Sequence, residues 1–159
     1  MTSVLTGQYL VNRMVMRVRL LEKIEEMLNT ISCEIRFLST PADRIIKQLC
    51  EKNEYDELIF LRICNEKISS GSDFKEAWLE SLNALVSKLY LNKNDLTLIR
   101  RFGSQFGTTD AEGQISICSM YLESIKNNLQ DSRSKKEQYA NLVNGISVLF
   151  GIGIIVVFI

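Results

Sequence analysis

The chain has 159 residues, of which 46% are hydrophobic and 24% are charged, and its 19 basic side chains balance 19 acidic ones. This balance argues against a general nucleic-acid binder, which would carry a strongly basic surface. Histidine is absent, so the commonest general base and metal ligand is missing, and no phosphate-binding or nucleophile motif is present. We therefore expect a protein that is not an enzyme and that needs no metal or cofactor.

The chain begins with a weakly apolar segment, residues 1–12, which is too short to cross a membrane. It is either the remnant of a longer membrane segment or a helix end that lies on the membrane. A first helix is expected from about residue 8 to 38, because apolar residues recur along it at alternating spacings of four and three. Only Arg17 interrupts this stripe, which is typical of a helix that packs in a bundle.

Start and stop signals mark five further helices. Thr40, Pro41 and Asp43 predict the start of the second, with Thr40 as the cap and Pro41 at the first helical position. Gly71 should end the third helix, and the Ser-Asp pair after it should cap the fourth. The expected helices span residues 41–51, 55–69, 73–89 and 95–106, and the sixth runs from about residue 110 onward.

The stretch that joins the fifth and sixth helices has the most specific pattern. Gly103 lies inside the fifth helix, where glycine costs about 1 kcal/mol relative to alanine, so we expect another helix to approach it closely. Gly107 should end this helix, and Thr109 with Glu112 has the spacing of a capping box that opens the sixth. No proline follows, so the sixth helix can continue into the end of the chain.

The last segment, residues 138–159, carries no charge, and from Leu142 onward only Asn144 and Ser147 are distinctly polar. Its length matches the roughly 20 residues with which a helix crosses a hydrocarbon core about 30 Å thick. A buried core helix would normally keep a polar face, which this segment lacks. We therefore predict a transmembrane helix here, preceded by one helical domain at residues 13–137.

Helix parity predicts how this domain stands on the membrane. Six helices with short connections should be antiparallel, so the chain starts and finishes at the same end of the bundle. Basic residues flank both ends of the domain, where they would contact lipid headgroups at the cytoplasmic face of the cell membrane, although ordinary surface charge is the alternative. These residues are Arg13, Arg17, Arg19, Arg133, Lys135 and Lys136.

Three connections should lie at the end away from the membrane, where a cytoplasmic partner would most easily meet them. Their expected partner-facing residues are Ser39, Thr40, Pro41, Gly71, Asp73, Gly107, Thr109 and Asp110. Their roles as helix starts and stops would explain these residues without any partner. In the tail, Ser147 and Gly151 form a small-xxx-small pair that would let two copies associate, so a homo-oligomer is an open alternative.

The four cysteines are Cys33, Cys50, Cys64 and Cys118. They form no C-x-x-C pair, and no histidine could complete a zinc site with them. In a cytoplasmic domain they should stay reduced, and we expect them to be buried as small hydrophobic side chains.

Several short pieces, in a fixed order and spacing, carry a resemblance to a known family. They are Ile31-Ser32-Cys33-Glu34-Ile35, Ser39-Thr40-Pro41, Ala77-Trp78, Asp95 and Phe102-Gly103-x-x-Phe106-Gly107-x-x-Asp110-x-x-x-Gln114. With the long last helix and the apolar tail, they resemble the stage III sporulation protein AB family of endospore-forming bacteria. That family is itself similar to the cytoplasmic domain of the F-type inner-membrane proteins of type II secretion and type IV pilus systems.

The resemblance implies an all-α, antiparallel six-helix bundle of the secretion F-domain type with a C-terminal transmembrane helix. It implies a non-catalytic platform on the mother-cell side of an export or channel complex between mother cell and forespore. Its partners would be membrane lipid, a cytoplasmic secretion-type ATPase and other membrane subunits. Members of the family usually begin with a full hydrophobic segment, in whose place this sequence has only residues 1–12. The alternative function is a tail-anchored helical adaptor or regulator unrelated to secretion.

Overall fold

The computed structural model describes the backbone of residues 2–38 and 40–158, and the side chains of residues 9–38 and 40–139. This part of the chain is helical, which confirms the expected all-α class with six α-helices. They are α1 (Thr2–Leu38), α2 (Ala42–Cys50), the 3₁₀ helix η1 (Asn53–Tyr55), α3 (Ile59–Ser69), α4 (Phe74–Leu85), α5 (Lys93–Gln105) and α6 (Ala111–Phe158).

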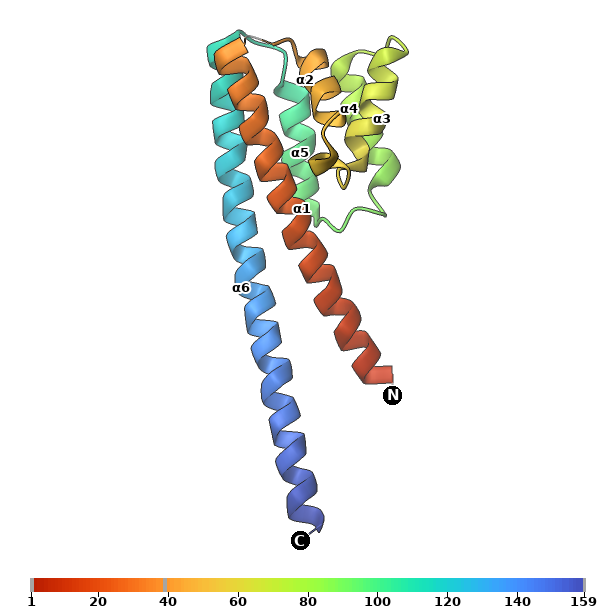
Figure 1. Ribbon diagram of the computed structural model, residues 1–159, viewed down its shortest axis with the longest axis vertical. Coiled ribbons are helices and arrows are strands. Elements are labelled where there is room, and N and C mark those ends of the chain that lie inside the picture. The colour runs from red at the N-terminus through yellow and green to blue at the C-terminus, as the bar shows by residue number, and fades with distance from the viewer. Residues whose placement is uncertain (1, 39, 159) are drawn as a thin grey trace.

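The two longest helices, α1 and α6, are antiparallel and pack against each other (Figure 1). They lie side by side along the upper part of the molecule, where α2 to α5 pack beside them as a compact cluster. Below this cluster the two long helices diverge. Both chain ends lie there, at the same end of the molecule, as helix parity predicted.

The core forms where the apolar stripe of α1 meets α2 to α6. Leu21, Ile24, Leu28 and Ile31 of the predicted stripe are all buried. An aromatic cluster fills the space between α3, α4, α5 and α6, with neighbouring ring centroids 5.1–5.8 Å apart. It consists of Phe60, Phe74, Trp78, Phe102, Phe106 and Tyr121.

The close approach expected at Gly103 is confirmed. A Cβ atom added to Gly103 would lie 2.0 Å from Cδ1 of Trp78, so the indole ring of α4 rests directly on the backbone of α5. The ring is held there because its Nε1 donates a hydrogen bond to the carbonyl oxygen of Ile99 at 2.9 Å. Because Gly103 has no side chain, Trp78, the largest side chain of the aromatic cluster, can pack directly against α5.

Several helix boundaries differ from the prediction: α1 is already helical at Thr2 instead of from about residue 8, and α3 begins at Ile59 instead of residue 55, because residues 53–55 form η1. α4 ends at Leu85, before the expected residue 89, because the chain turns there and brings Leu89 and Leu91 into the core. α5 begins at Lys93, two residues before the expected residue 95. Asn92 caps this helix reciprocally with Asp95 in a capping box.

Two of the predicted helix caps are wrong. Thr40 donates a hydrogen bond to the Glu34 carboxylate at 3.3 Å, and Pro41 occupies the cap position of α2 without any side-chain hydrogen bond. At the start of α6 the cap is Asp110, whose Oδ1 accepts a hydrogen bond from the backbone N–H of Gly113 at 3.0 Å. The carboxylate of Asp110 thus takes the place of the predicted capping box between Thr109 and Glu112.

Three other predicted signals at the helix ends are confirmed. Gly71 and Gly107 have φ angles of 98° and 80°, the left-handed conformation that favours glycine after a helix. Asp73 caps α4 by accepting a hydrogen bond from the N–H of Lys75 at 3.1 Å. Each of these residues therefore has a local structural role in addition to any role in binding.

The predicted transmembrane segment, residues 138–159, is the last part of α6, and its backbone is helical as far as Phe158. Its side chains from residue 140 onward, like those of residues 1–8, lie outside the described residues. Among the described residues, none of the helices combines the length and the apolar character that a membrane crossing requires. The transmembrane helix therefore stays a prediction.

Candidate functional site

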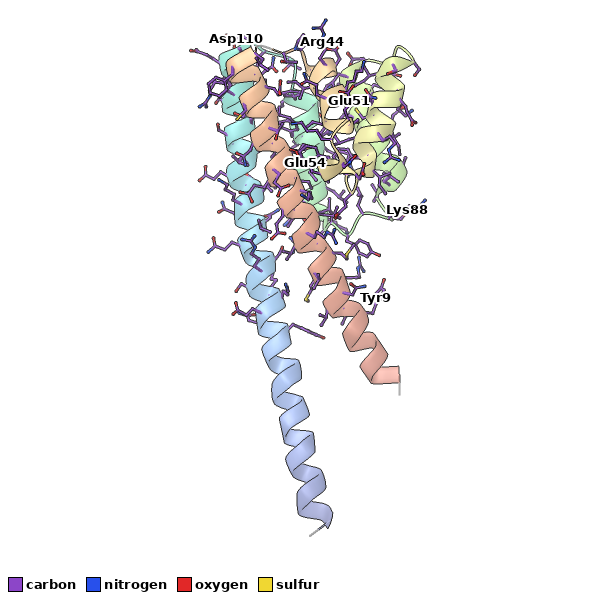
Figure 2. The ribbon with its side chains drawn as sticks, in the orientation of Figure 1. Tyr9, Arg44, Glu51, Glu54, Lys88 and Asp110 are labelled. Atoms are coloured by element: carbon purple, nitrogen blue, oxygen red, sulfur yellow. The ribbon has the colours of Figure 1, made fainter. Side chains whose placement is uncertain are left out.

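The predicted partner-facing residues gather at the end of the molecule opposite the chain termini. Asp110 and Arg44 mark this end in Figure 2, whereas Tyr9 lies toward the other. We call the surface formed by residues 40–42, 70–73 and 106–110 the loop face. Of the predicted partner-facing residues, Thr40 is half-buried and Ser39 lies outside the described residues. The remaining six are exposed: Pro41, Gly71, Asp73, Gly107, Thr109 and Asp110.

Two exposed apolar side chains stand beside the loop face. The side chains of Phe37 and Leu38, at the end of α1, are 76% and 66% exposed. Leu38 is the last residue of the apolar stripe predicted along the first helix, so its expected inward position is wrong, whereas Phe37 lies outside that stripe. Both are exposed because the last turn of α1 extends past the core, which ends at Ile35. Their apolar surface is available for contact with a partner at this end of the molecule.

The predicted membrane-flanking basic residues lie toward the other end, and four of the six form ion pairs within the protein. The pairs are Arg17–Asp95, Arg19–Glu57, Arg133–Glu22 and Lys135–Asp131. Arg13 lies 6.0 Å from the ring centroid of Tyr9, and Lys136 is exposed. The side chains of Arg19, Arg133 and Lys135 keep about 60% of their surface in solvent. Their contact with lipid headgroups stays a prediction.

Arg17 differs from the other five because it points into the protein. Its side chain is only 16% exposed, and the Asp95 side chain that it meets is fully buried. Nε of Arg17 donates to Oδ2 of Asp95 at 2.8 Å, and Nη2 donates to Oδ1 at 3.1 Å. This two-bond geometry is the strongest form of an arginine–carboxylate pair.

Two further donors complete the surroundings of the Asp95 carboxylate. Nδ2 of Asn128, on α6, donates to Oδ1 at 2.8 Å, and the backbone N–H of Asn92 donates to Oδ2 at 3.0 Å. Each carboxylate oxygen therefore accepts two hydrogen bonds, which offsets the cost of burying its charge. We call Arg17, Asn92, Asp95 and Asn128 the Asp95 cluster.

Only Arg17 could be expected from the sequence to take part in a buried polar contact. Arg17 interrupts the apolar stripe of the first helix, and a charged side chain on a buried face needs a partner of opposite charge. Asp95 was predicted to start the fifth helix and is one of the residues that carry the family resemblance; its place at the helix start is confirmed, since it belongs to the capping box of α5. Nothing in the sequence links the two residues, which are 78 positions apart.

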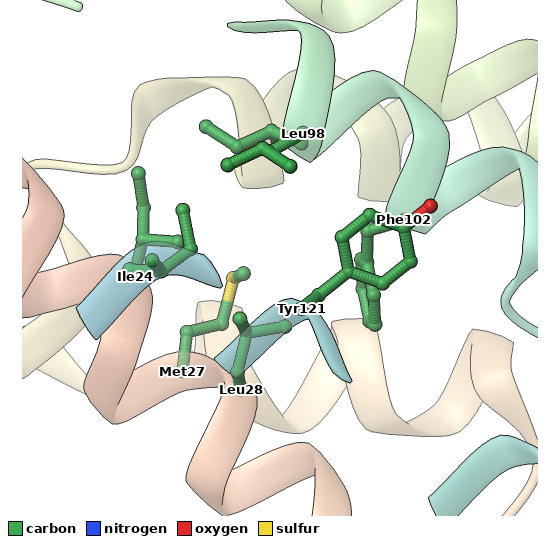
Figure 3. A pocket seen from close by; sticks show the side chains of 8 residues that line it. Ile24, Met27, Leu28, Leu98, Phe102 and Tyr121 are labelled. Atoms are coloured by element: carbon green, nitrogen blue, oxygen red, sulfur yellow. The ribbon is translucent and has the colours of Figure 1, made fainter. Parts of the chain in front are cut away.

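The enclosed space inside the core is too small for a substrate. The cavity in Figure 3 holds about 10 Å³, roughly the volume of one water molecule. It is lined by apolar and aromatic side chains from α1, α5 and α6: Ile24, Met27, Leu28, Leu98, Ile99, Phe102, Tyr121 and Ile125. Within the described residues, no three His, Cys, Asp or Glu side chains come together as a metal site would require.

The cysteines differ from one another in exposure. Cys64 and Cys118 are buried as predicted, and burial raises the pKa of both thiols to about 12. Cys50 is half-buried, and desolvation raises its pKa as well. Cys33 is exposed, so the prediction that all four cysteines are buried is wrong. Its helix turns this position away from the core while Ile31 and Ile35 face inward.

This difference predicts the pattern of thiol labelling. At about pH 8 a maleimide reagent should modify Cys33 first and Cys50 more slowly, while Cys64 and Cys118 react only after unfolding, because their buried thiols stay protonated. Mass spectrometry of labelled peptides, with and without urea, measures the order. Labelling of Cys118 as fast as that of Cys33 in the folded protein would contradict the packing of α6.

The sequence profile of the family described as stage III sporulation protein AB matches residues 1–159. A solved structure of stage III sporulation protein AB (SpoIIIAB) resembles this fold with a TM-score of 0.63 at 23% sequence identity. The superposition covers 77% of this chain and 98% of that chain. At this identity the structural likeness is evidence for the fold alone. The comparison with curated proteins found no match.

Proposed function

The chain belongs to the stage III sporulation protein AB family and so has a role in sporulation, and from this premise we propose that it is a non-catalytic membrane platform. In this proposal it stands in an export or channel complex between mother cell and forespore, at the membrane of the mother cell. The tail of α6 crosses that membrane, and the loop face docks a cytoplasmic secretion-type ATPase. Other membrane subunits complete the complex.

The observation that carries this proposal is that the chain ends and the loop face lie at opposite ends of the molecule. Both chain ends, including the apolar tail, lie on one side of the helical domain, and the loop face lies on the opposite side (Figure 1). A domain anchored through its tail would therefore hold the loop face away from the bilayer, where a large cytoplasmic partner can reach it. The exposed side chains of Phe37 and Leu38 provide the apolar contact that the centre of a protein interface needs.

The membrane end is consistent with the same orientation. The exposed cations Arg19, Arg133 and Lys135 keep most of their surface in solvent although each is ion-paired. A basic side chain near an anionic membrane surface gains about 1 kcal/mol. The carboxylate partner of each of these residues offsets part of that gain. The anchoring itself would come from the uncharged tail rather than from these contacts.

Two variants test the docking proposal without disturbing the fold. Phe37→Glu places a charge on the exposed apolar pair, and Asp110→Asn removes a charge while keeping a residue that caps helices equally well. We expect Phe37→Glu to weaken binding of the purified ATPase to the full chain in lipid nanodiscs by about tenfold or more, as for a hot-spot residue. Asp110→Asn should weaken binding by a smaller factor.

The matched control is Val86→Glu, which adds the same charge to an exposed apolar residue at the far end of α4. It should bind the ATPase as the unmodified chain does. Unchanged binding by both loop-face variants would rule out docking at the loop face. A full chain that inserts into the nanodisc but does not bind the ATPase would instead favour a tail-anchored adaptor unrelated to secretion. Gly107 is unsuitable for this test because its positive φ would strain any other residue.

A further inference from the structure

The Asp95 cluster lies at the level where the packed core ends. Among the described side chains, the last buried one along α1 toward the N-terminus is that of Val18, and along α6 toward the C-terminus it is that of Ser132. Beyond these positions the described side chains of residues 9–16 and 133–139 are all exposed or half-exposed. Figure 1 shows α1 and α6 diverging below this level. The cluster therefore lies among the last buried contacts of the described residues before the two helices separate.

Asp95 joins both of these helices to a third. Its carboxylate binds the guanidinium of Arg17 on α1 and the amide of Asn128 on α6, while its own backbone N–H is held by the Asn92 cap of α5. Hydrogen bonds to a charged, buried carboxylate are directional, and the planar guanidinium fits it in one orientation. Interdigitated apolar side chains fix the angle between α1 and α6 higher in the core. Before Val18 the described side chains of α1 are at most half-buried, so at this level the cluster provides the directional contacts between α1, α5 and α6.

We propose that the Asp95 cluster is a latch that fixes the direction in which α1 leaves the domain relative to α6. With the latch closed, the lower halves of the two helices keep one angle to each other. With it open, the part of α1 before Val18 keeps only half-buried apolar contacts, such as those of Met14 and Met16, and this part of the helix can bend to other directions. The latch would thus set the geometry that the domain imposes on the segments at its membrane end.

α5 connects the latch to the loop face, and this step rests on the proposed function of the loop face. α5 begins at the cluster and ends at the turn around Gly107, which belongs to the loop face. Its 13 residues make a rod about 20 Å long. A partner that displaces the turn would move this rod, and with it the Asp95 carboxylate. Docking at one end of the molecule would then alter the angle between α1 and α6 at the other.

Spin-label distance measurements on the full chain in nanodiscs test the latch. The lower pair of labels is attached at Asn12→Cys and Lys136→Cys, and the upper pair at Asn29→Cys and Met120→Cys, all at exposed positions. The two accessible native thiols are first removed by the substitutions Cys33→Ser and Cys50→Ser. The buried thiols can remain, because their pKa values of about 12 keep them unreactive.

Asp95→Asn removes the charge but keeps an oxygen for the capping box, and Asn128→Ala removes only the bond from α6. Both should broaden the distance distribution of the lower pair and leave that of the upper pair unchanged. The matched control, Glu22→Gln, breaks the exposed pair between α1 and Arg133 of α6 and should change neither distribution.

A lower-pair distribution that stays as narrow as in the unmodified chain would overturn the latch. Equal broadening of both pairs would also overturn it, because the cluster would then only stabilise the domain as a whole. ATPase binding is measured on the same samples. A chain that binds the ATPase without any change in the lower pair would overturn the link through α5 and leave the docking proposal intact. Absence of binding would refute docking and leave the latch result standing.

Discussion

Replacement of Arg17 by methionine is expected to lower the free energy of unfolding by about 3–5 kcal/mol, the usual cost of leaving a buried charge without its partner. The Asp95 side chain is fully buried, and the substitution removes two of its four hydrogen bonds together with its counterion. Methionine fills much of the volume of the aliphatic part of the arginine side chain, so no large cavity forms. The loss of stability therefore comes from the unpaired buried charge of Asp95. Urea unfolding followed by circular dichroism measures the difference.

The same measurement on Arg133→Met gives the matched control. Arg133 also joins α6 to α1, through Glu22 at 2.6 Å, but both side chains of that pair are substantially exposed. An exposed ion pair contributes at most about 1 kcal/mol, so this variant should unfold close to the unmodified protein. If Arg17→Met cost no more than Arg133→Met, the buried pair would contribute no more than an exposed one. The latch would then lack its main physical basis.

The helices could be predicted from the sequence because their signals are local. The 4-3 spacing in the first helix identified Leu21, Ile24 and Leu28 as core residues, and all three are buried. Gly71 and Gly107 identified helix ends because few other residues adopt the backbone conformation found there. Gly103 was recognised as a point of close approach because glycine inside a helix needs a compensating contact.

What the sequence could not provide depends on the relative placement of the helices. Arg17 was recognised as an interruption of an apolar stripe, but its partner Asp95 is known only once α1 and α5 are packed. The prediction of Thr109 as the cap of α6 was also wrong, because the cap is Asp110. The two neighbouring residues have similar preferences for the cap position, and only the path of the chain determines which of them caps the helix. The exposure of Phe37 likewise depends on how far α1 extends past the core.

Replacement of Gly103 by alanine is expected to destabilise the domain by about 2 kcal/mol, although alanine favours a helix by about 1 kcal/mol. The new Cβ would lie 2.0 Å from the Trp78 ring, so either the ring or the whole of α5 must move. The ring cannot move cheaply, because it is fully buried, hydrogen-bonded to Ile99 and packed against Phe60 and Phe102. Overpacking in such a site costs about 1–3 kcal/mol or more, and we expect it to exceed the gain in helix propensity.

Thr97→Ala separates these two effects, because Thr97 lies on the same helix but is exposed. It should be neutral or slightly stabilising in urea unfolding, since alanine is the better helix former and no buried contact is lost. A second test is the double variant Gly103→Ala with Trp78→Phe, in which the smaller ring leaves room for the added methyl group. If the clash is the cause, the double variant should lose less stability than the sum of its two single variants. Strict additivity, or a Gly103→Ala variant as stable as the unmodified protein, would mean that α4 and α5 are not held at this distance by the indole ring.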